Sequence, residues 1–371
     1  MKTEIHRLRG GPPGTIHELR VLRFGTPDAR PKATVQAALH ADETPALLVA
    51  QALRDQLQQL EDSGALRGEV VLVPAANPVG LGQQLLGRHE GRFDLHDGIN
   101  FNRGHANLAD RAQQQLQGRL GSDPQGNVML VRQALLEAAQ SLQSKTLAED
   151  LKHALLLLAI DSDVVLDLHC DSQAVVHLYA LPQHETKAME LGALLGARAV
   201  LLASDSGDGP FDEACSRPWV QLQERFAAYP IPAACFASTV ELRGECDTDL
   251  AQAQEDASAL VAFLRRQGVV AGEPDVLPTA QCRPTPLAAS EPVTAPHAGA
   301  VVFHARPGDH LSSGDAIATL VEIDTGRHTV LRVQSDGVMY ACISTRWAAA
   351  GQRLAKVAGS TLMRTGNLLS A

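Results

Sequence analysis

The stretch Val35-Gln-Ala-Ala-Leu-His40-Ala-Asp-Glu43-Thr-Pro45 decides the fold. Its residues up to Leu39 alternate like a strand that is buried on one face. Thr44 is suited to the N-cap of a helix and Pro45 to its first turn. An apolar stripe then continues at helical spacing through Leu47, Leu48, Leu53, Leu57 and Leu60. His40 and Glu43 therefore fall in a turn between a strand and a helix, where the ligands of open α/β sheets bind.

Residues 1–34 are expected to be an extended lead-in, and the chain after residue 68 continues the alternation of strands and helices. Residues 69–74 are short, apolar and β-branched, and with the preceding strand and helix they predict a parallel βαβ unit. Helical periodicity covers 128–160, 211–229 and 248–267. We expect further strands at 164–169, at 174–180 as its neighbour, at 199–203 and at 234–242. The pattern predicts an α/β fold with a sheet flanked by helices.

The chain divides by composition into three parts. We predict a catalytic domain over residues 1–270, a proline-rich linker over 271–291 and a β-rich accessory domain over 292–371. The accessory domain contains an internal repeat, because 297–303 aligns with 335–341 and 313–317 with 350–354. It resembles the barrel-sandwich fold of biotinyl and lipoyl carrier domains. The hairpin that carries the modified lysine in those domains has none here, at 324–327, which argues against a carrier function.

Charge and composition exclude several classes of protein. The formal net charge of the 371 residues is −10, which argues against a nucleic-acid-binding surface. The most apolar run, 154–160, is too short to span a bilayer, so we expect no membrane partner. The N-terminus lacks the apolar segment of a secretory signal. The six cysteines form no Cys-x-x-Cys motif, which favours reduced thiols and a cytoplasmic protein.

Three side chains are candidates for one metal site. His40 and Glu43 taken alone also fit a solvated pair that caps a helix. His169 ends an apolar strand, and parallel strands would bring it to the same edge of the sheet as His40. Two imidazoles and one carboxylate leave one tetrahedral position open, as in catalytic zinc sites. Asp167 either orients this site or pairs with a basic group.

Other polar residues supply candidates for catalysis and substrate binding. Glu241 also ends a strand and is suited to a general base and acid, although taken alone a salt bridge to Arg243 or to another surface group explains it slightly better. Asn102 and Arg103 could hold a substrate carboxylate. An upstream arginine, Arg92 in preference to Arg88, could stabilise an oxyanion. Two histidines near this segment are alternative metal ligands, namely His96 and His105.

Taken in order, these motifs resemble the succinylglutamate desuccinylase/aspartoacylase family, a branch of the zinc carboxypeptidase superfamily. They are His40-x-x-Glu43, Asn77-Pro78, Asn102-Arg103, Asp167-Leu-His169 and Thr239-x-Glu241. The resemblance implies a zinc-carboxypeptidase-like mixed sheet with a C-terminal β domain. It also implies one Zn²⁺ per chain on His40, Glu43 and His169. Glu241 would then be the general base and acid, Asn102 and Arg103 would bind a carboxylate, and Arg92 would stabilise the oxyanion.

Two positions depart from the family pattern. Asn100 stands where an aspartate usually supports the first zinc histidine, and its amide oxygen can still accept that hydrogen bond without a charge. The usual Phe-Pro-Gly-like continuation after the Asn-Arg pair is replaced by Gly104-His105-Ala106. These differences indicate a divergent subgroup, so the substrates of the named enzymes cannot simply be transferred.

The expected function is a zinc-dependent amidohydrolase that cleaves the amide bond of an N-acyl amino acid or a related small amide. A metallocarboxypeptidase that acts on peptides and a non-catalytic binding protein that retains the fold remain alternatives. The expected partner is the small-molecule substrate, and a homo-oligomer is left open.

Overall fold

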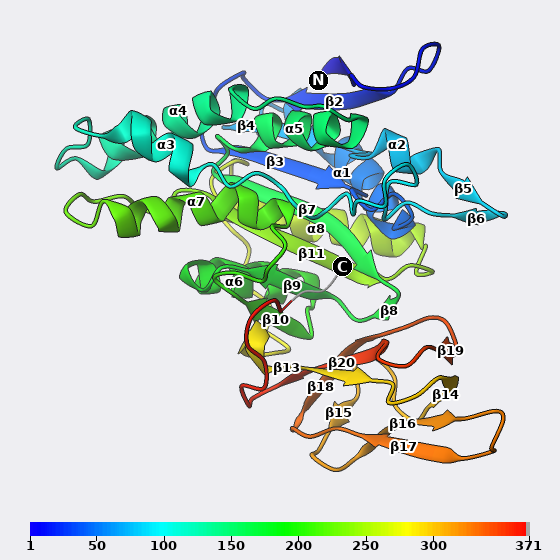
Figure 1. Cartoon of the computed structure of the whole chain (residues 1–371). Coiled ribbons are helices and arrows are strands. Elements are labelled where there is room, and N and C mark those ends of the chain that lie inside the picture. The colour runs from blue at the N-terminus through cyan, green and yellow to red at the C-terminus, as the bar shows by residue number, and fades with distance from the viewer. Residues whose placement is uncertain (369–371) are drawn as a thin grey trace.

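The computed structural model describes residues 1–368 and contains one large mixed sheet with helices on both faces (Figure 1). The nine strands lie, in spatial order, as β1 (Lys2–Arg7), β2 (Glu18–Phe24), β4 (Glu69–Val73), β3 (Lys32–Ala37), β7 (Val164–Asp171), β11 (Phe236–Gly244), β9 (His177–Ala180), β10 (Ala199–Leu202) and β12 (Pro284–Pro286). The central strands β4, β3, β7 and β11 are parallel. β1, β2 and β9 introduce antiparallel pairs. The predicted α/β class is therefore confirmed.

Two layers of helices cover the sheet. One hydrophobic core lies between the sheet and α1 (Thr44–Asp62), α6 (Glu185–Leu195) and α8 (Leu250–Arg266). The other core lies on the opposite face, under α3 (Ala109–Leu116), α4 (Pro124–Gln140), α5 (Leu147–Ala159) and α7 (Phe211–Arg225). Every residue of β3 and β4 is buried, because both faces of these strands are covered. A short helix α2 (Pro78–Leu81) and the hairpin of β5 (Gln84–Leu85) and β6 (Arg88–His89) complete this part.

The C-terminal residues form two facing sheets around a separate small core. One sheet contains β13 (Ser290–Thr294), β20 (Arg353–Gly359), β18 (Gly337–Cys342) and β15 (His310–Leu311), and the other contains β17 (His328–Arg332), β16 (Ala316–Val321), β14 (Gly299–Phe303) and β19 (Trp347–Ala348). The repeat seen in the sequence corresponds to two antiparallel pairs, β14 with β16 and β18 with β20. The expected all-β C-terminal fold is present.

The C-terminal sheets are joined to the large sheet by backbone pairing. β8 (Gln173–Ala174), which follows β7 directly, pairs with β18. An apolar cluster crosses the same junction, and it includes Tyr179, Leu201, Leu287 and Tyr340. The proline-rich segment expected as a linker contains β12, which pairs with β10 at the edge of the large sheet. The two parts therefore share both hydrogen bonds and apolar contacts.

Two local predictions need correction. β9 lies beside β11, not beside β7, because the chain leaves the sheet after β7 to form β8 and returns antiparallel on the far side of β11. The N-cap of α1 is Glu43, one residue before the predicted Thr44, and it makes no side-chain capping bond. The Glu43 carboxylate is directed to other partners, which are described below.

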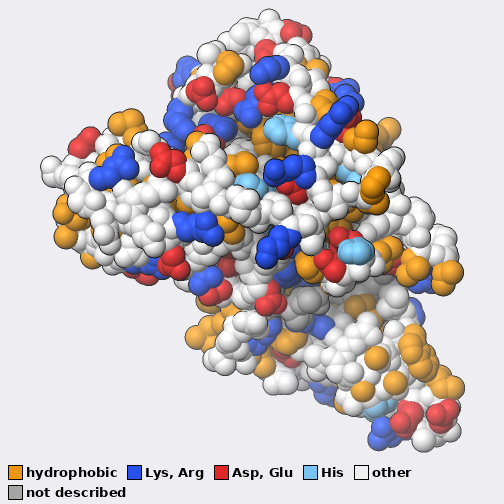
Figure 2. Space-filling model, turned by 45° about the horizontal axis from the view of Figure 1, so that its top comes forward, with side chains coloured by type: hydrophobic (Ala, Val, Ile, Leu, Met, Phe, Trp, Pro, Cys, Tyr) orange, Lys and Arg blue, Asp and Glu red, His pale blue; other side chains and the backbone are white. Residues whose placement is uncertain are grey.

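The surface carries charged side chains of both signs, as the composition predicts. On the face shown in Figure 2, basic and acidic side chains are interspersed. Within residues 1–368, none of the helices is both long and apolar enough to cross a membrane.

Candidate metal centre and active site

The three predicted metal ligands, His40, Glu43 and His169, lie together at the carboxyl ends of the central strands, and we call them the metal group. Glu43 is between the two imidazoles, with Oε1 2.9 Å from His40 Nδ1 and Oε2 2.7 Å from His169 Nδ1. One ligand atom from each residue falls within 4.8 Å of the others, and all three side chains are buried. Nitrogen and carboxylate donors in this number are the set that a catalytic zinc site uses. The residues present therefore fit a zinc ion.

The backbone brings these residues together at the end of β3. Ala38 adopts a left-handed conformation, with φ of 56°, and its N–H donates to Leu168 O on the neighbouring strand β7. This turn places His40 and Glu43 above the sheet, next to the end of the strand that carries His169. Such conformations are uncommon for non-glycine residues and are often found at functional sites.

A further set of contacts orients both imidazoles. His40 Nε2 is 2.9 Å from Asn100 Oδ1, so the amide oxygen accepts a hydrogen bond from the imidazole. His169 Nε2 is 3.0 Å from Asp167 Oδ2. The Nδ1 atom of each ring faces Glu43, so Nδ1 is the atom through which each imidazole would bind a metal. Asp167 is itself held by Gln36, which donates to its Oδ1 at 2.8 Å.

Burial and the neighbouring charges set the protonation of this group. Burial lowers the pKa of His40 to about 4, and the guanidinium of Arg92 adds to that effect. Burial would also lower the pKa of His169, but Asp167 and Glu43 raise it well above its ordinary value. Burial would raise the pKa of Glu43, but the facing imidazoles of His169 and His40 lower it well below its ordinary value. Glu43 is thus a carboxylate and His40 a neutral imidazole, as metal binding requires, whereas His169 would release a proton when a metal binds.

Arg92 lies against the metal group, whereas Arg88 belongs to the exposed β5–β6 hairpin. Arg92 Nη2 is 2.7 Å from Glu43 Oε1, and the side chain lines the adjoining cavity. Gly91 permits this approach, because a Cβ at that position would come within 2.2 Å of the backbone nitrogen of Asp42.

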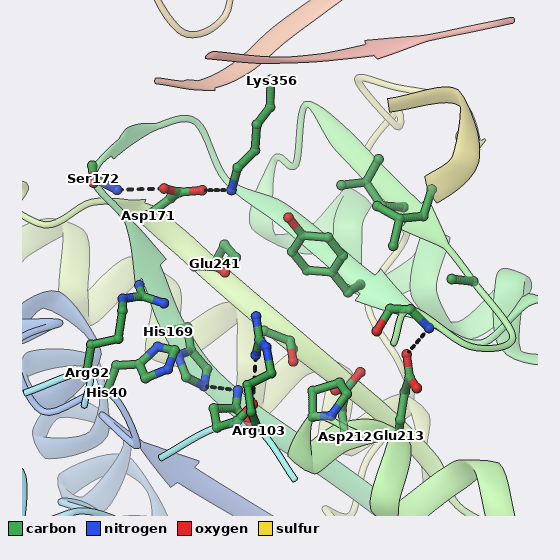
Figure 3. Close-up of a pocket in the computed structure, with 18 of the residues that line it drawn as sticks. His40, Arg92, Arg103, His169, Asp171, Ser172, Asp212, Glu213, Glu241 and Lys356 are labelled. Atoms are coloured by element: carbon green, nitrogen blue, oxygen red, sulfur yellow. Dashed lines mark hydrogen bonds and ion pairs between the residues drawn. The ribbon is translucent and has the colours of Figure 1, made fainter. Parts of the chain in front are cut away.

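Asn102 and Arg103 border the same cavity but make different contacts. Asn102 is buried, with Nδ2 3.1 Å from His169 Nε2, and its Oδ1 accepts from the N–H of Phe211 at 2.9 Å. Its amide therefore joins the metal group to the start of α7. Arg103 donates from Nη1 to its neighbour's carbonyl oxygen at 2.7 Å, and its guanidinium faces the cavity (Figure 3).

Glu241 is in register with His169 on the adjacent strand β11 and lines the cavity. Its Oε2 is buried and makes no hydrogen bond within the described part of the chain. The alternative partner, Arg243, forms an ion pair with Asp256 instead. Burial, together with the carboxylates of Glu43 and Asp171, raises the pKa of Glu241 to about 8. An unpaired carboxyl group with a raised pKa beside a metal group is typical of a general base and acid.

The other histidines considered from the sequence do not join this centre. His105 is buried and packs edge-on against Phe211, with ring centroids 5.3 Å apart. His96 has no place in a metal group. Among residues 1–368, His40, Glu43 and His169 are the one group of three potential ligands that meets the distance criterion.

The cavity also contains charged residues that the sequence did not predict. Its volume is about 480 Å³, which is typical of a site for a small molecule. Lys356 of β20 reaches into it and forms an ion pair with Asp171 at the end of β7 (Figure 3). Asp212 and Glu213 line another wall at the start of α7. Asp171 could have been identified from its position two residues after His169, but no spacing along the chain relates Lys356 to the metal group.

Comparison with known proteins identifies the same family over most of the chain. Residues 29–265 match the model of the succinylglutamate desuccinylase/aspartoacylase catalytic domain. No curated protein matches the sequence. The fold is similar to that of a succinylglutamate desuccinylase/aspartoacylase family protein from Shewanella amazonensis SB2B. The two chains are 28% identical, with a TM-score of 0.83 and coverage of 96% of this chain and 98% of the other.

Two more distant structures share the fold. A succinylglutamate desuccinylase/aspartoacylase protein from Shewanella frigidimarina is 24% identical, with a TM-score of 0.83, and the match covers 96% of this chain and 97% of that one. The product-bound ectoine utilization protein EutE (DoeB) from Ruegeria pomeroyi is 17% identical, with a TM-score of 0.66, and the match covers 97% and 95%. In all three cases the similarity extends through the C-terminal sheets.

Proposed function

The chain belongs to the succinylglutamate desuccinylase/aspartoacylase family, and on that basis we propose that it is a zinc-dependent hydrolase. Its substrate is the amide of an N-acyl amino acid or a similar small molecule. The observation that carries this proposal is the convergence of His40, Glu43 and His169 beside Glu241 in one cavity.

His40, Glu43 and His169 would hold the zinc ion. When bound there, zinc would polarise the substrate carbonyl and acidify a water molecule. The remaining steps depend on side chains of this chain. Glu241 takes a proton from the attacking water and delivers it to the departing amine, so that the C–N bond breaks as a neutral amine leaves.

The arginines position the substrate and stabilise charge. The guanidinium of Arg92 lies beside the metal group, where the carbonyl oxygen becomes negative as water adds. Arg103 faces the cavity and can bind a carboxylate of the amino acid with two parallel hydrogen bonds. The proposed leaving group is therefore the amino acid.

The size of the cavity favours a small amide over a peptide. Residues of the C-terminal sheets, including Gln352 and Lys356, form one of its walls. A peptide chain would have to pass this wall, whereas an acylated amino acid fits within about 480 Å³. A panel of N-acyl amino acids and short peptides with free carboxyl termini separates the two activities.

The experiment that tests the proposal is the substitution Glu241→Gln. We expect the zinc content to be unchanged, because position 241 is not a ligand. We expect kcat for N-acyl amino acid hydrolysis to fall by about 10²–10⁴-fold, because the proton acceptor is lost. Glu255→Gln, at an exposed position on α8, is the matched control and should retain full activity. Unchanged turnover in Glu241→Gln would refute the assignment.

A further inference from the structure

The last described residues, 361–368, form a tail that no step of the mechanism above uses. The tail returns from β20 to the large sheet and lies beside β10 (Figure 1). Two backbone hydrogen bonds fix its start, since the N–H groups of Met363 and Arg364 donate to Ala288 O at 3.0 and 3.1 Å. The tail therefore follows a defined course over the junction of the two parts.

The end of the tail is buried against the cavity wall. Leu368 is only 8% exposed, and the guanidinium of Arg364 donates a hydrogen bond to its carbonyl oxygen. The side chain of Leu368 belongs to the apolar cluster that contains three cavity-lining residues, Tyr179, Leu201 and Leu287. Leu368 therefore lies behind the apolar part of the wall.

The tail also contacts the loop of residues 205–210, which leads into α7. The N–H of Leu368 donates to Ser206 O at 2.8 Å. The Asn367 amide donates from Nδ2 to Asp208 Oδ1 at 3.3 Å. Since Ser206 is one of the residues that line the cavity, the tail holds a part of the cavity wall in place.

The conformation of this loop depends on its neighbours. Gly207, Asp208 and Gly209 adopt positive φ values of 91°, 59° and 56° in succession. Glycine has many other conformations available, and such values are uncommon for aspartate. The tail approaches closely here, because a Cβ at Gly207 would come within 2.8 Å of the Asn367 side chain. Contacts from outside the loop therefore maintain its shape.

The other side of the loop supports the segment that carries Arg103. The N–H of Gly104 donates to Asp208 O at 2.6 Å, and the N–H of His105 donates to Gly209 O at 3.0 Å. Both bonds directly follow Arg103, whose guanidinium faces the cavity. The tail, the loop and Arg103 are thus connected in series, with the loop between the other two.

We propose that the tail of residues 361–368 positions Arg103 for substrate binding and that it acts through the loop of residues 205–210. The inference rests on the proposed function and adds a positioning element to it. Arg103 binds the substrate carboxylate in the ground state and in the transition state alike. A loosened Arg103 should therefore raise KM and change kcat little.

Hydrogen–deuterium exchange of the full chain tests the physical connection without an activity measurement. In Leu368→Ala we expect the amides of residues 103–106 to exchange about 10-fold faster, because truncation of a buried leucine weakens the packing that holds the loop. Leu362→Ala is the matched control, since this leucine of the same tail is 69% exposed, and it should leave the exchange unchanged. Faster exchange confined to the tail, or spread over the whole chain, would overturn the inference.

Steady-state kinetics test the consequence for substrate binding, with the N-acyl amino acid that the zinc-loaded wild type hydrolyses best. In Leu368→Ala we expect KM to rise about 10-fold and kcat to stay within about 2-fold of the wild type. Asn367→Ala should change KM in the same direction by a smaller factor, and Leu362→Ala should not change it. The zinc content should be the same in all variants, because the tail does not contact the metal group. An unchanged KM in Leu368→Ala would overturn the inference and leave the proposed function intact.

The two measurements separate failure of the inference from failure of the proposed function. If the wild type hydrolyses no N-acyl amino acid, the proposed function fails, and the exchange of residues 103–106 alone decides whether the tail holds the segment of Arg103. If the wild type is active and Leu368→Ala matches it in both exchange and KM, only the inference fails.

Discussion

The position of Glu43 explains why a single residue links the fold to the chemistry. It precedes the first turn of α1, where side chains commonly cap the helix, yet it makes no cap. Its carboxylate instead contacts His40, His169 and Arg92. The helix start keeps this carboxylate at the rim of the sheet, and Pro45 in the first turn needs no hydrogen-bond partner for its nitrogen. The residue thus gives up a capping bond to complete the metal group.

Asn100 provides a test of how the metal group is supported. Its Oδ1 accepts hydrogen bonds from His40 Nε2 and from the N–H of Asn102, at 2.9 and 2.8 Å. In Asn100→Asp, a negative charge behind His40 should make the imidazole a stronger ligand. We expect zinc to bind about 10-fold more tightly, measured by competition with a chelator. An unchanged or weaker affinity would show that the neutral amide already supports His40 fully.

The residues of the metal group could be predicted from the sequence because they lie at, or a few residues beyond, the carboxyl ends of strands in a parallel sheet. That topology brings His40, His169 and Glu241 to one edge whatever the lengths of the connections. Asp212 and Lys356 could not be predicted in this way. Asp212 reaches the cavity through a loop held by hydrogen bonds, and Lys356 reaches it from another sheet, so neither placement leaves a periodic signal.

At the scale of elements, the segment after β7 connects the metal group to the C-terminal sheets. Asp171 ends β7, two residues after His169, and pairs with Lys356 of β20. β8 follows at once and adds to the sheet of β18. This connection also explains why β9 does not neighbour β7, which the sequence alone could not indicate. The central strands could be located from hydrophobicity, but β1 and β2 could not, and the departure of β8 depends on a distant partner.

The ion pair between Asp171 and Lys356 should contribute measurably to stability. The side chains are 17% and 22% exposed, so neither is freely solvated. We expect Lys356→Met to lower the free energy of unfolding by about 2 kcal/mol, because it leaves Asp171 partly buried without its cation. Asp171→Asn combined with Lys356→Met should lose less than the sum of the two single changes. Urea denaturation measures these values.

The exposed Lys145 supplies the control for that series, since Lys145→Met should change the free energy of unfolding by less than about 0.5 kcal/mol. If Lys356→Met lowered the free energy of unfolding by no more than this control does, the ion pair would not stabilise the contact between the two parts.

At the scale of the whole molecule, the two parts should unfold as one unit. They share the pairing of β8 with β18 and the apolar cluster that includes Tyr179, Leu201 and Tyr340. The two tryptophans report on different parts, since Trp219 lies in α7 and Trp347 in β19. In Trp219→Phe, the fluorescence of Trp347 follows the C-terminal sheets, while far-ultraviolet circular dichroism follows mainly the helices.

We expect both signals of Trp219→Phe to change at the same urea concentration, because an interface of this kind couples the two folding units. In Trp347→Phe, the fluorescence of the remaining Trp219 and the circular dichroism should also change at the same urea concentration. Separate transitions would instead mean that the C-terminal sheets unfold independently and that the cavity wall they form can open.

The central claim is that His40, Glu43 and His169 bind one zinc ion, and metal analysis tests it most directly. After loading with zinc and removal of excess metal, the wild type should contain one zinc per chain. The control His304→Ala, which removes an exposed histidine of the C-terminal sheets, should also contain one zinc per chain. His169→Ala should retain less than about a tenth of an equivalent, because two ligands do not hold zinc at a site of this kind. A wild type without zinc, or a full equivalent in His169→Ala, would contradict the account.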